Sequence, residues 1–218
     1  MKSQWDERYA ADEYVYGTEP NDFLREVARR IPQGPVLLLA EGEGRNAVHL
    51  AELGYEVTAL DQSAPGLAKA QRLAAQRGVE LTTLEADLAD YEIEPGAWSG
   101  IVAIFMHLPP ELRARVLGQV RRGLRPGGVF VMEAYTPAQL THRTGGPPVR
   151  ELLVTLEELR SELGAEQPAV SVQEGARPKE GAEQSLTLEH GVELERDIHE
   201  GRLHHGRSAV AQVVAVKG

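Results

Sequence analysis

Short apolar runs alternate with longer amphipathic stretches along the first 135 residues of the chain. The continuous apolar character of the runs predicts strands that are buried on both faces, as in a parallel sheet. These strands are expected at residues 36–40, 55–60, near 80–84, 101–106 and 129–134. The stretches between them show helical spacing of apolar residues and predict helices over 45–53, 64–77 and 109–124. Alternation of this kind predicts a doubly wound, mostly parallel sheet with helices on both faces.

The pattern changes outside this central part. Residues 1–31 predict a cap or lid followed by a helix that Asn21 begins. Residues 136–150 contain three prolines and two glycines and predict a long loop, and residues 165–184 predict a variable loop. Between these loops, Thr155 and Glu158 form a capping box for a helix that ends near Leu163.

Two β-like runs, 192–198 and 208–216, predict an antiparallel hairpin at the end of the chain. The hairpin brings the expected sheet to seven strands. We therefore expect residues 1–218 to form one domain with a Rossmann-like sheet, closed by antiparallel strands.

A glycine-containing loop follows the first expected strand. Gly42 and Gly44 stand between that strand and the helix that starts near Arg45. Glycines here let the backbone approach a ligand, and the N–H groups of the next helix attract an anion. Asp61 ends the second strand, where a carboxylate can accept both hydroxyls of a ribose. This arrangement predicts a site for a ribose-containing cofactor.

Two acidic residues near this site each have an alternative interpretation. Asp61 precedes the helix at 64–77 and is a candidate cap for it, although Ser63 is the better candidate. Asp87 follows the third strand and is placed to accept from an adenine amino group, or is simply an acid in a surface turn.

Composition limits the classes of partner. The net charge of −10 makes nucleic acid a poor partner, because an acidic chain repels phosphate. No run approaches the roughly 18 apolar residues of a membrane span. The chain has no cysteine, which excludes disulfides and thiolate metal sites and fits a cytoplasmic protein. His204 and His205 suggest a metal, but no third ligand completes a set, so we expect none.

Taken together, the loop, Asp61, Asp87, the strand 101–107 and Arg125-Pro126-Gly127-Gly128 resemble the ordered motifs of class I S-adenosylmethionine-dependent methyltransferases. The resemblance covers roughly residues 36–134, and the terminal hairpin fits that family's sheet. Trp5-Asp6-Glu7-Arg8-Tyr9 and Gly17-Thr18-Glu19-Pro20-Asn21 look like the small bacterial branch that includes tellurite-resistance and thiol or thiopurine methyltransferases.

This resemblance implies S-adenosyl-L-methionine as the cofactor. It implies that the glycine loop lines the methionine part, that Asp61 holds the ribose, that residues 86–88 frame the adenine, and that 104–107 lie beneath the sulfonium. The cofactor-binding residues expected on this basis are Glu41, Gly42, Gly44, Arg45, Asn46, Asp61, Gln62, Ala86, Asp87, Leu88, Ile104 and His107.

The loop departs from the family pattern at two positions. The family usually has an acid two residues before the first glycine, and this chain has Leu38 there and Ala40 in place of that glycine. Our hypothesis is that Glu41 takes over the contact to the cofactor's amino group.

The acceptor is expected where the fourth and fifth strands end. His107 is the candidate general base, or a cap for the helix that follows, and Tyr135 is the candidate wall of the acceptor site. His142 and Arg143 lie in the loop 136–150, where a lid would form. The predicted reaction is in-line methyl transfer to a small-molecule thiol or chalcogen, amine or hydroxyl. A base matters less for a thiolate, which is already ionised.

Two other functions compete with this prediction. A nicotinamide-dependent oxidoreductase uses the same strand, turn and helix, although the chain lacks a Tyr-x-x-x-Lys pair for hydride chemistry. A non-catalytic protein that binds S-adenosylmethionine is the second, because the loop is altered at Leu38 and Ala40. The sequence leaves the methyl acceptor and the oligomeric state open.

Overall fold

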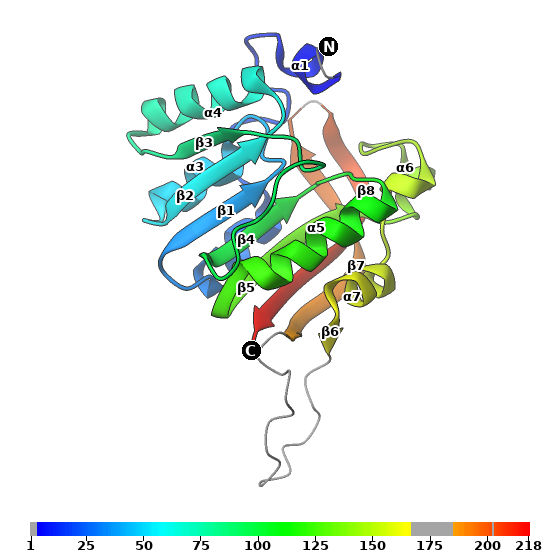
Figure 1. Cartoon of the computed structure of the whole chain (residues 1–218). Helices are drawn as coiled ribbons and strands as arrows, with labels where there is room; N and C mark the ends of the chain where they lie inside the picture. The colour runs from blue at the N-terminus through cyan, green and yellow to red at the C-terminus, as the bar shows by residue number, and fades with distance from the viewer. Residues whose placement is uncertain (1–3, 167–184, 202) are drawn as a thin grey trace, which may run out of the picture.

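A single mixed sheet organises the chain, as seen in a computed structural model that describes residues 4–166, 185–201 and 203–218 (Figure 1). Its strand order is β3-β2-β1-β4-β5-β8-β7-β6. β1 to β5 run parallel, and β8 is antiparallel to both β5 and β7. The strands are β1 (Pro35–Leu39), β2 (Glu56–Asp61), β3 (Thr82–Glu85), β4 (Trp98–Ile104), β5 (Leu124–Tyr135), β6 (Ala165–Glu166), β7 (Leu186–Glu200) and β8 (His204–Lys217).

The predicted doubly wound sheet with an antiparallel C-terminal hairpin is therefore confirmed. The expected seven strands are present in the order β3-β2-β1-β4-β5-β8-β7. The two-residue strand β6 adds an eighth at the edge, parallel to β7. β6 occupies the start of the loop expected at 165–184, so that prediction is wrong for its first two residues. Residues 167–184 lie outside the described part of the chain.

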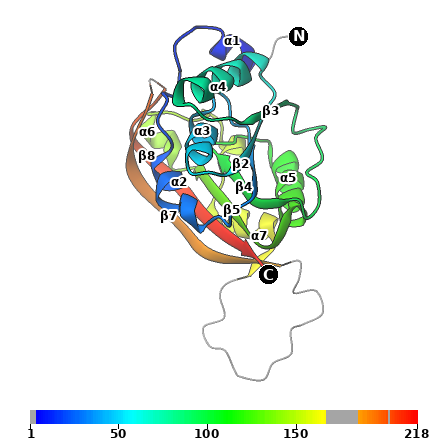
Figure 2. The same cartoon turned by 90° about the vertical axis from the view of Figure 1, so that its left-hand side faces the viewer.

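Helices cover both faces of the sheet (Figures 1 and 2). α5 and α7 pack on one face, and α2, α3 and α4 pack on the other. The helices are α1 (Gln4–Tyr9), α2 (Asp22–Val27), α3 (Arg45–Glu52), α4 (Ala64–Arg77), α5 (Pro110–Gly123), α6 (Gln139–His142) and α7 (Leu156–Leu163), with single turns η1 (Ala28–Arg30) and η2 (Arg150–Leu152). Across the part of the chain that the structure describes, no helix combines the length and apolar character that crossing a bilayer requires.

Local sequence signals place several helix ends correctly. The Ser63 side chain accepts from Gly66 N and caps α4, which ends at Gly78 in the left-handed region with φ of 70°. The capping box of Thr155 and Glu158 begins α7 as predicted. These ends are predictable because each depends on a hydrogen bond or backbone conformation within a few residues.

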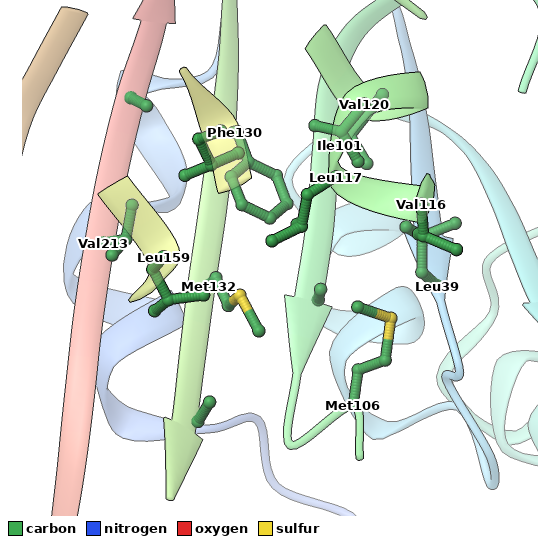
Figure 3. Close-up of a cluster of buried hydrophobic side chains, with 14 of the residues drawn as sticks. Leu39, Ile101, Met106, Val116, Leu117, Val120, Phe130, Met132, Leu159 and Val213 are labelled. Carbon is green, nitrogen blue, oxygen red and sulfur yellow. The ribbon is translucent and has the colours of Figure 1, made fainter. Parts of the chain in front are cut away.

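β1 shows why the strands are apolar throughout. Leu37 and Leu39 pack towards α5, while Val36 and Leu38 pack towards α2 and α3. Figure 3 shows strand side chains such as Phe130 facing Leu117 of α5 within the first of these two cores. Leu38, at the position where the family usually has an acid, is 1% exposed and belongs to the second core.

Two stretches that contain glycine and proline form regular structure. The turn at residues 125–128 lies inside β5 as a shift in its register with β4, where Gly127 has a φ of 73°. The loop expected at 136–150 contains α6 and the start of η2. Both stretches hold glycine and proline, but contacts distant in sequence decide their conformation.

A network of buried charges joins β5 to the C-terminal hairpin. The Glu133 side chain is fully buried in β5 and accepts from Arg196 of β7 at 2.5 Å and from Gln212 of β8 at 2.5 Å. Arg196 also donates to Glu200 at 2.9 Å. A buried carboxylate is stable only when it is paired and hydrogen-bonded.

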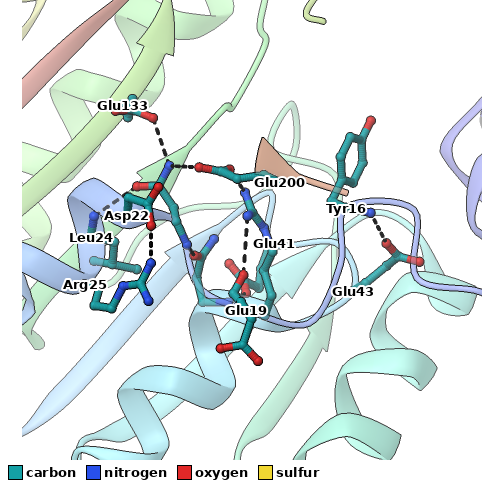
Figure 4. Close-up of polar contacts among 12 residues, drawn as sticks. Tyr16, Glu19, Asp22, Leu24, Arg25, Glu41, Glu43, Glu133 and Glu200 are labelled. Atoms are coloured by element: carbon teal, nitrogen blue, oxygen red, sulfur yellow. Dashed lines mark hydrogen bonds and ion pairs between the residues drawn. The ribbon is translucent and has the colours of Figure 1, made fainter. Parts of the chain in front are cut away.

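The same network reaches the N-terminal segment and α3 (Figure 4). Arg45, the first residue of α3, donates to Glu200 at 2.6 Å. The fully buried Asn21 donates to both Glu133 and Glu200, at 2.8 and 2.9 Å, and its oxygen caps α2. Two arginines balance two glutamates, so the network is neutral.

Replacing Arg196 by Met tests this network. We expect Arg196→Met to lower the free energy of unfolding by roughly 3–5 kcal/mol, because it leaves buried Glu133 without its cation. The measurement is urea denaturation. Arg207→Met is the matched control on the same hairpin, since the Arg207–Glu195 pair is about half exposed and contributes about 0–1 kcal/mol. Equal effects of the two variants would contradict this role for the network.

Candidate functional site

A cavity of about 1060 Å³ opens at the carboxyl ends of the parallel strands. Loops that follow β1, β2, β3 and β4 line it, together with the N-terminal segment, the loop after β5 and the tip of the β7–β8 hairpin. β1 and β4 flank the point where the strand order reverses, which is where open α/β sheets bind ligands. The volume is at the top of the usual range of about 300–1,000 Å³ for ligand pockets, which leaves room for a cofactor and a second molecule.

Ten of the twelve cofactor-binding residues expected from the sequence line this cavity, and Gly42 and Gly44 do not. A Cβ at Gly42 would lie 2.6 Å from Tyr9 Oη, and one at Gly44 would lie 2.4 Å from Ala70 Cβ. Both glycines have positive φ, 65° and 90°. The structure therefore gives them a packing reason: they let α1 and α4 lie against the loop.

Asp61 holds the glycine loop in place. One carboxylate oxygen accepts from Gly42 N at 2.8 Å, and the other accepts from Ser63 N at 2.9 Å. Burial raises the pKa of Asp61, and these backbone hydrogen bonds act in the opposite direction. Since Ser63 is the cap of α4, Asp61 does not take that role and instead faces the cavity.

Glu41 occupies the start of α3. One of its oxygens accepts from Asn46 N at 2.9 Å and from Ala47 N at 2.8 Å. These N–H groups belong to the first turn of α3, where the sequence predicts that an anion of the cofactor binds. Ala40, before it, has a positive φ of 53°, which is the conformation a glycine would adopt without strain. Burial raises the pKa of Glu41 to about 7.

The N-terminal segment lies over the loop and is fixed to it by a buried ion pair. Lys69 of α4 and Glu43 of the loop are 2.7 Å apart and almost completely buried. The other Glu43 oxygen accepts from Val15 N and Tyr16 N, a contact visible in Figure 4, and Lys69 also donates to Glu13 O. This pair places Tyr16 at the cavity.

Gln62, Ala86, Asp87 and Leu88 line the part of the cavity that follows β2 and β3. Asp87 is exposed, and one of its oxygens accepts from Ala89 N at 2.8 Å. That bond belongs to a local turn, and the second oxygen is available to a ligand. Both interpretations of Asp87 therefore fit its geometry.

Aromatic rings gather at the far side of the cavity, beyond β4. The backbone of Phe105 has a positive φ of 54°. Its ring stacks on the ring of Tyr135, with centroids 4.6 Å apart. His107 lies nearly parallel to Tyr135, and His204 contacts Tyr16 and Phe105 at 4.5 and 4.7 Å. We call Tyr16, Phe105, His107 and His204 the aromatic box.

The two residues predicted for the acceptor side, His107 and Tyr135, have different positions relative to the aromatic box. His107 lines the cavity, and burial lowers its pKa to about 4 against the effect of a hydrogen bond to the Leu152 backbone. Tyr135 is fully buried behind Phe105 and does not line the cavity. It supports the rings that do.

Sequence reasoning missed Tyr9, Phe105 and His204 as parts of one site, and it identified His204 only as part of a His-His pair. For Tyr16 the sequence leaves two interpretations open, packing in the core or lid and closing over a sulfonium, and Tyr16 lines the cavity. Nothing in their local sequence brings them together, since the hairpin places His204 beside Tyr16.

Arg143 also lines the cavity, while His142 contacts Glu195 at 3.1 Å. Among the described residues, no three potential ligands cluster to hold a metal.

Comparison with known sequences places the chain near methyltransferases. Residues 36–128 match the family described as "Methyltransferase domain". A demethylmenaquinone methyltransferase of Thermus thermophilus is 36% identical over 104 residues, which are 47% of either chain. A cypemycin N-terminal methyltransferase of a Streptomyces species is 28% identical over 153 residues, 65% of this chain and 60% of the relative. The chain spans about half the length of the curated relatives it matches.

Solved structures agree on the fold. A structure described for the conversion of a disulfide bond into a thioacetal group during echinomycin biosynthesis has a TM-score of 0.72 at 18% identity, covering 98% of this chain and 90% of the other. TehB from Haemophilus influenzae has a TM-score of 0.67 at 18% identity, covering 98% and 66%. At these identities the likeness establishes the fold alone.

Glu41 is expected to make stability depend on pH. Its folded pKa of about 7 lies above the ordinary 4.5, so the folded chain keeps a proton that the unfolded chain loses between these values. The free energy of unfolding should therefore fall as pH rises from about 4.5 to 7, on the order of 1–2 kcal/mol because the carboxyl is only partly covered.

The measurement is urea denaturation of the wild type and Glu41→Gln between pH 5 and 7.5. The substitution keeps an oxygen for the helix N–H groups and removes the titration, so the two stability curves should converge as pH falls. Glu80→Gln, at an exposed position away from the cavity, is the control. Parallel curves for Glu41→Gln and wild type would show that Glu41 does not titrate in this range.

Proposed function

We propose that the chain is a class I S-adenosylmethionine-dependent methyltransferase, which transfers the methyl group of this cofactor to a small-molecule acceptor. The observation that carries the proposal is one continuous cavity, which joins the Asp61 end, suited to a nucleoside, to the aromatic box. Such a cavity brings two reactants together and shields them from water.

The residues at the strand ends fit the cofactor. Asp61 uses one acceptor position on each oxygen for the backbone, and a carboxylate has about four, so two remain for the ribose hydroxyls. Asp87 and Gln62 face the region proposed for the adenine, between the apolar side chains of Ala86 and Leu88. Glu41, with Ala40, borders the region proposed for the methionine part, where an ionised Glu41 would attract the amino group.

The aromatic box is the proposed acceptor end. S-adenosylmethionine supplies a methyl group already activated on a sulfonium, so the protein mainly aligns the reactants. Aromatic faces such as Tyr16 and Phe105 favour a cation near them. Alignment of this kind contributes up to roughly 7–11 kcal/mol in intramolecular models. His107, neutral at pH 7, is the proposed partner beneath the sulfonium, and Tyr135 positions it.

Segments outside the central sheet supply the acceptor specificity in this proposal. Residues 1–31 act as the cap, and residues 136–150 form the acceptor side of a single methyltransferase domain over residues 1–218. Leu140 and Leu203 are exposed apolar residues that line the cavity, so an acceptor with an apolar or aromatic body fits the entrance. The names of the relatives specify different acceptors, and we therefore keep a thiol or chalcogen, an amine and a hydroxyl as candidates.

A binding and turnover experiment tests this function. Calorimetry should detect binding of S-adenosylhomocysteine, and labelled S-adenosylmethionine should transfer its methyl group to at least one of phenylmethanethiol, benzylamine and phenol. These probes share an aromatic ring and differ in the nucleophilic atom. Binding of NAD in place of S-adenosylhomocysteine would favour an oxidoreductase. Cofactor binding without transfer to any probe would favour a non-catalytic protein.

Asp61 provides a sharper test of the cofactor position. Asp61→Asn should weaken S-adenosylhomocysteine binding by roughly 10- to 100-fold, since hydrogen bonds to a charged group contribute about 1.5–3 kcal/mol. Calorimetry measures the dissociation constant, and circular dichroism checks that the variant folds. Asp90→Asn is the control, because Asp90 is exposed and does not line the cavity. Unchanged affinity of Asp61→Asn would remove Asp61 from the ribose site.

A further inference from the structure

His204 has a buried nitrogen that the fold leaves without a partner. His204 is 6% exposed, and its Nδ1 has no hydrogen-bond partner among the described residues. The residue lines the cavity at the aromatic box. An unsatisfied buried polar atom costs about 1–3 kcal/mol, which a ligand with a donor group would recover.

The ring is held firmly from several sides. Its centroid is 4.5 Å from Tyr16 and 4.7 Å from Phe105, and Tyr135 contacts it edge-on at 5.5 Å. These rings come from the N-terminal segment, the end of β4 and the end of β5. Three separate elements therefore fix the orientation of one histidine, which is a requirement for a group that acts on a bound ligand.

The loop after β5 closes over the same histidine. A Cβ at Gly145 would lie 3.2 Å from His204 Cδ2, and Gly145 has a φ of 150°, so the loop backbone approaches closely. Thr144 O accepts from His205 N at 3.2 Å and ties the loop to the hairpin. A molecule bound in the box thus meets His204 at a position set by both segments.

His107 donates from one ring nitrogen to the Leu152 backbone, and we assign it to the sulfonium side of the site. We propose that His204 Nδ1 is a catalytic proton acceptor, which receives the proton of an S–H or O–H acceptor during methyl transfer. The role rests on the proposed function. It assigns the acceptor a protonated nucleophilic atom and leaves His107 beneath the sulfonium.

Methyl transfer and proton transfer occur together in the proposed step. The acceptor sulfur or oxygen forms a bond to the methyl carbon, while the bond from that carbon to the sulfonium breaks and its electron pair stays on the cofactor sulfur. The S–H or O–H proton moves to His204 Nδ1, and the resulting imidazolium later gives it to solvent. No oxidant or further reactant is needed.

The surroundings keep His204 neutral before the step and disfavour its imidazolium, so the ring takes the proton only as the methyl group transfers and then releases it. Burial lowers its pKa well below the ordinary value, and the charges of Arg45 and Arg8 act in the same direction. The charged and titratable groups facing it are Arg8 and Tyr16 of the N-terminal segment, Arg45 of α3, His107 after β4, Tyr135 of β5, and Arg196 and Glu200 of β7. Most of these charged groups are arginines, so the electrostatic field at this position stabilises the negative charge of an acceptor that loses its proton.

Two substitutions at His204 test the role. His204→Phe keeps an aromatic ring in the box and removes both nitrogens, and His204→Asn places an amide near the position of Nδ1. With phenylmethanethiol at pH 6, where this alkyl thiol is almost wholly protonated, we expect His204→Phe to lower kcat by roughly 10²- to 10⁴-fold, the usual contribution of a general base. We expect KM and S-adenosylhomocysteine affinity to stay within threefold, and His204→Asn to recover part of the loss.

The pH profile separates catalysis from a structural role. At pH 9 a large fraction of phenylmethanethiol ionises without help, so the loss in His204→Phe should shrink to less than about tenfold. A defect caused by poor packing would persist at every pH. His199→Phe is the matched control on the same hairpin, because His199 contacts His205 with tilted rings and does not line the cavity.

Each other result would overturn the role. Transfer that His204→Phe leaves within twofold, or a loss that does not change with pH, would exclude His204 as the proton acceptor while the methyltransferase function stands. Transfer to benzylamine alone would do the same, since a free amine reacts without losing a proton first. Absence of transfer from wild type to every probe would overturn the proposed function, and this role with it.

Discussion

The buried pairing of Glu133 and Glu200 with Arg45 and Arg196 is the constraint on which the rest of this structure depends. Two carboxylates inside a protein are unfavourable unless cations and hydrogen bonds meet them. The cations come from different places: Arg45 begins the helix after the glycine loop, and Arg196 lies on the C-terminal hairpin. Satisfying the charges therefore requires α3, β5 and the hairpin to meet at one point. Asn21 adds the N-terminal segment by hydrogen-bonding both carboxylates.

The cavity exists because of this meeting point. The hairpin tip carries His204 next to Tyr16, and the buried pair of Lys69 and Glu43 holds the backbone before Tyr16 against the glycine loop. The two buried ionic clusters thus fix the walls of a site whose floor is the sheet. The proposed acceptor end and the proposed cofactor end of the cavity share these supports. A substitution in either ionic cluster is therefore expected to affect binding at both ends.

The glycine loop shows how a sequence motif and its structural reason differ. Gly42 and Gly44 predict a close ligand, yet side chains of α1 and α4 occupy the space next to them. Glu41 fills the helix start that the motif predicts for an external carboxylate. Leu38, where the family has an acid, is part of the apolar core. Contacts within the chain therefore occupy several positions of this loop that the motif predicts for a ligand.

The sequence by itself determined the parallel strands, most helix ends, the hairpin and the strand-end positions of Asp61 and His107. These follow from periodicity and from hydrogen bonds between residues close in the chain, which act in any context. Tertiary structure alone decided that Tyr135 lies behind the cavity, that Glu133 is buried with Arg196, and that His204 joins the aromatic box. These outcomes depend on which distant segments pack together, and the balance of buried charge that sets this packing leaves no local pattern in the sequence.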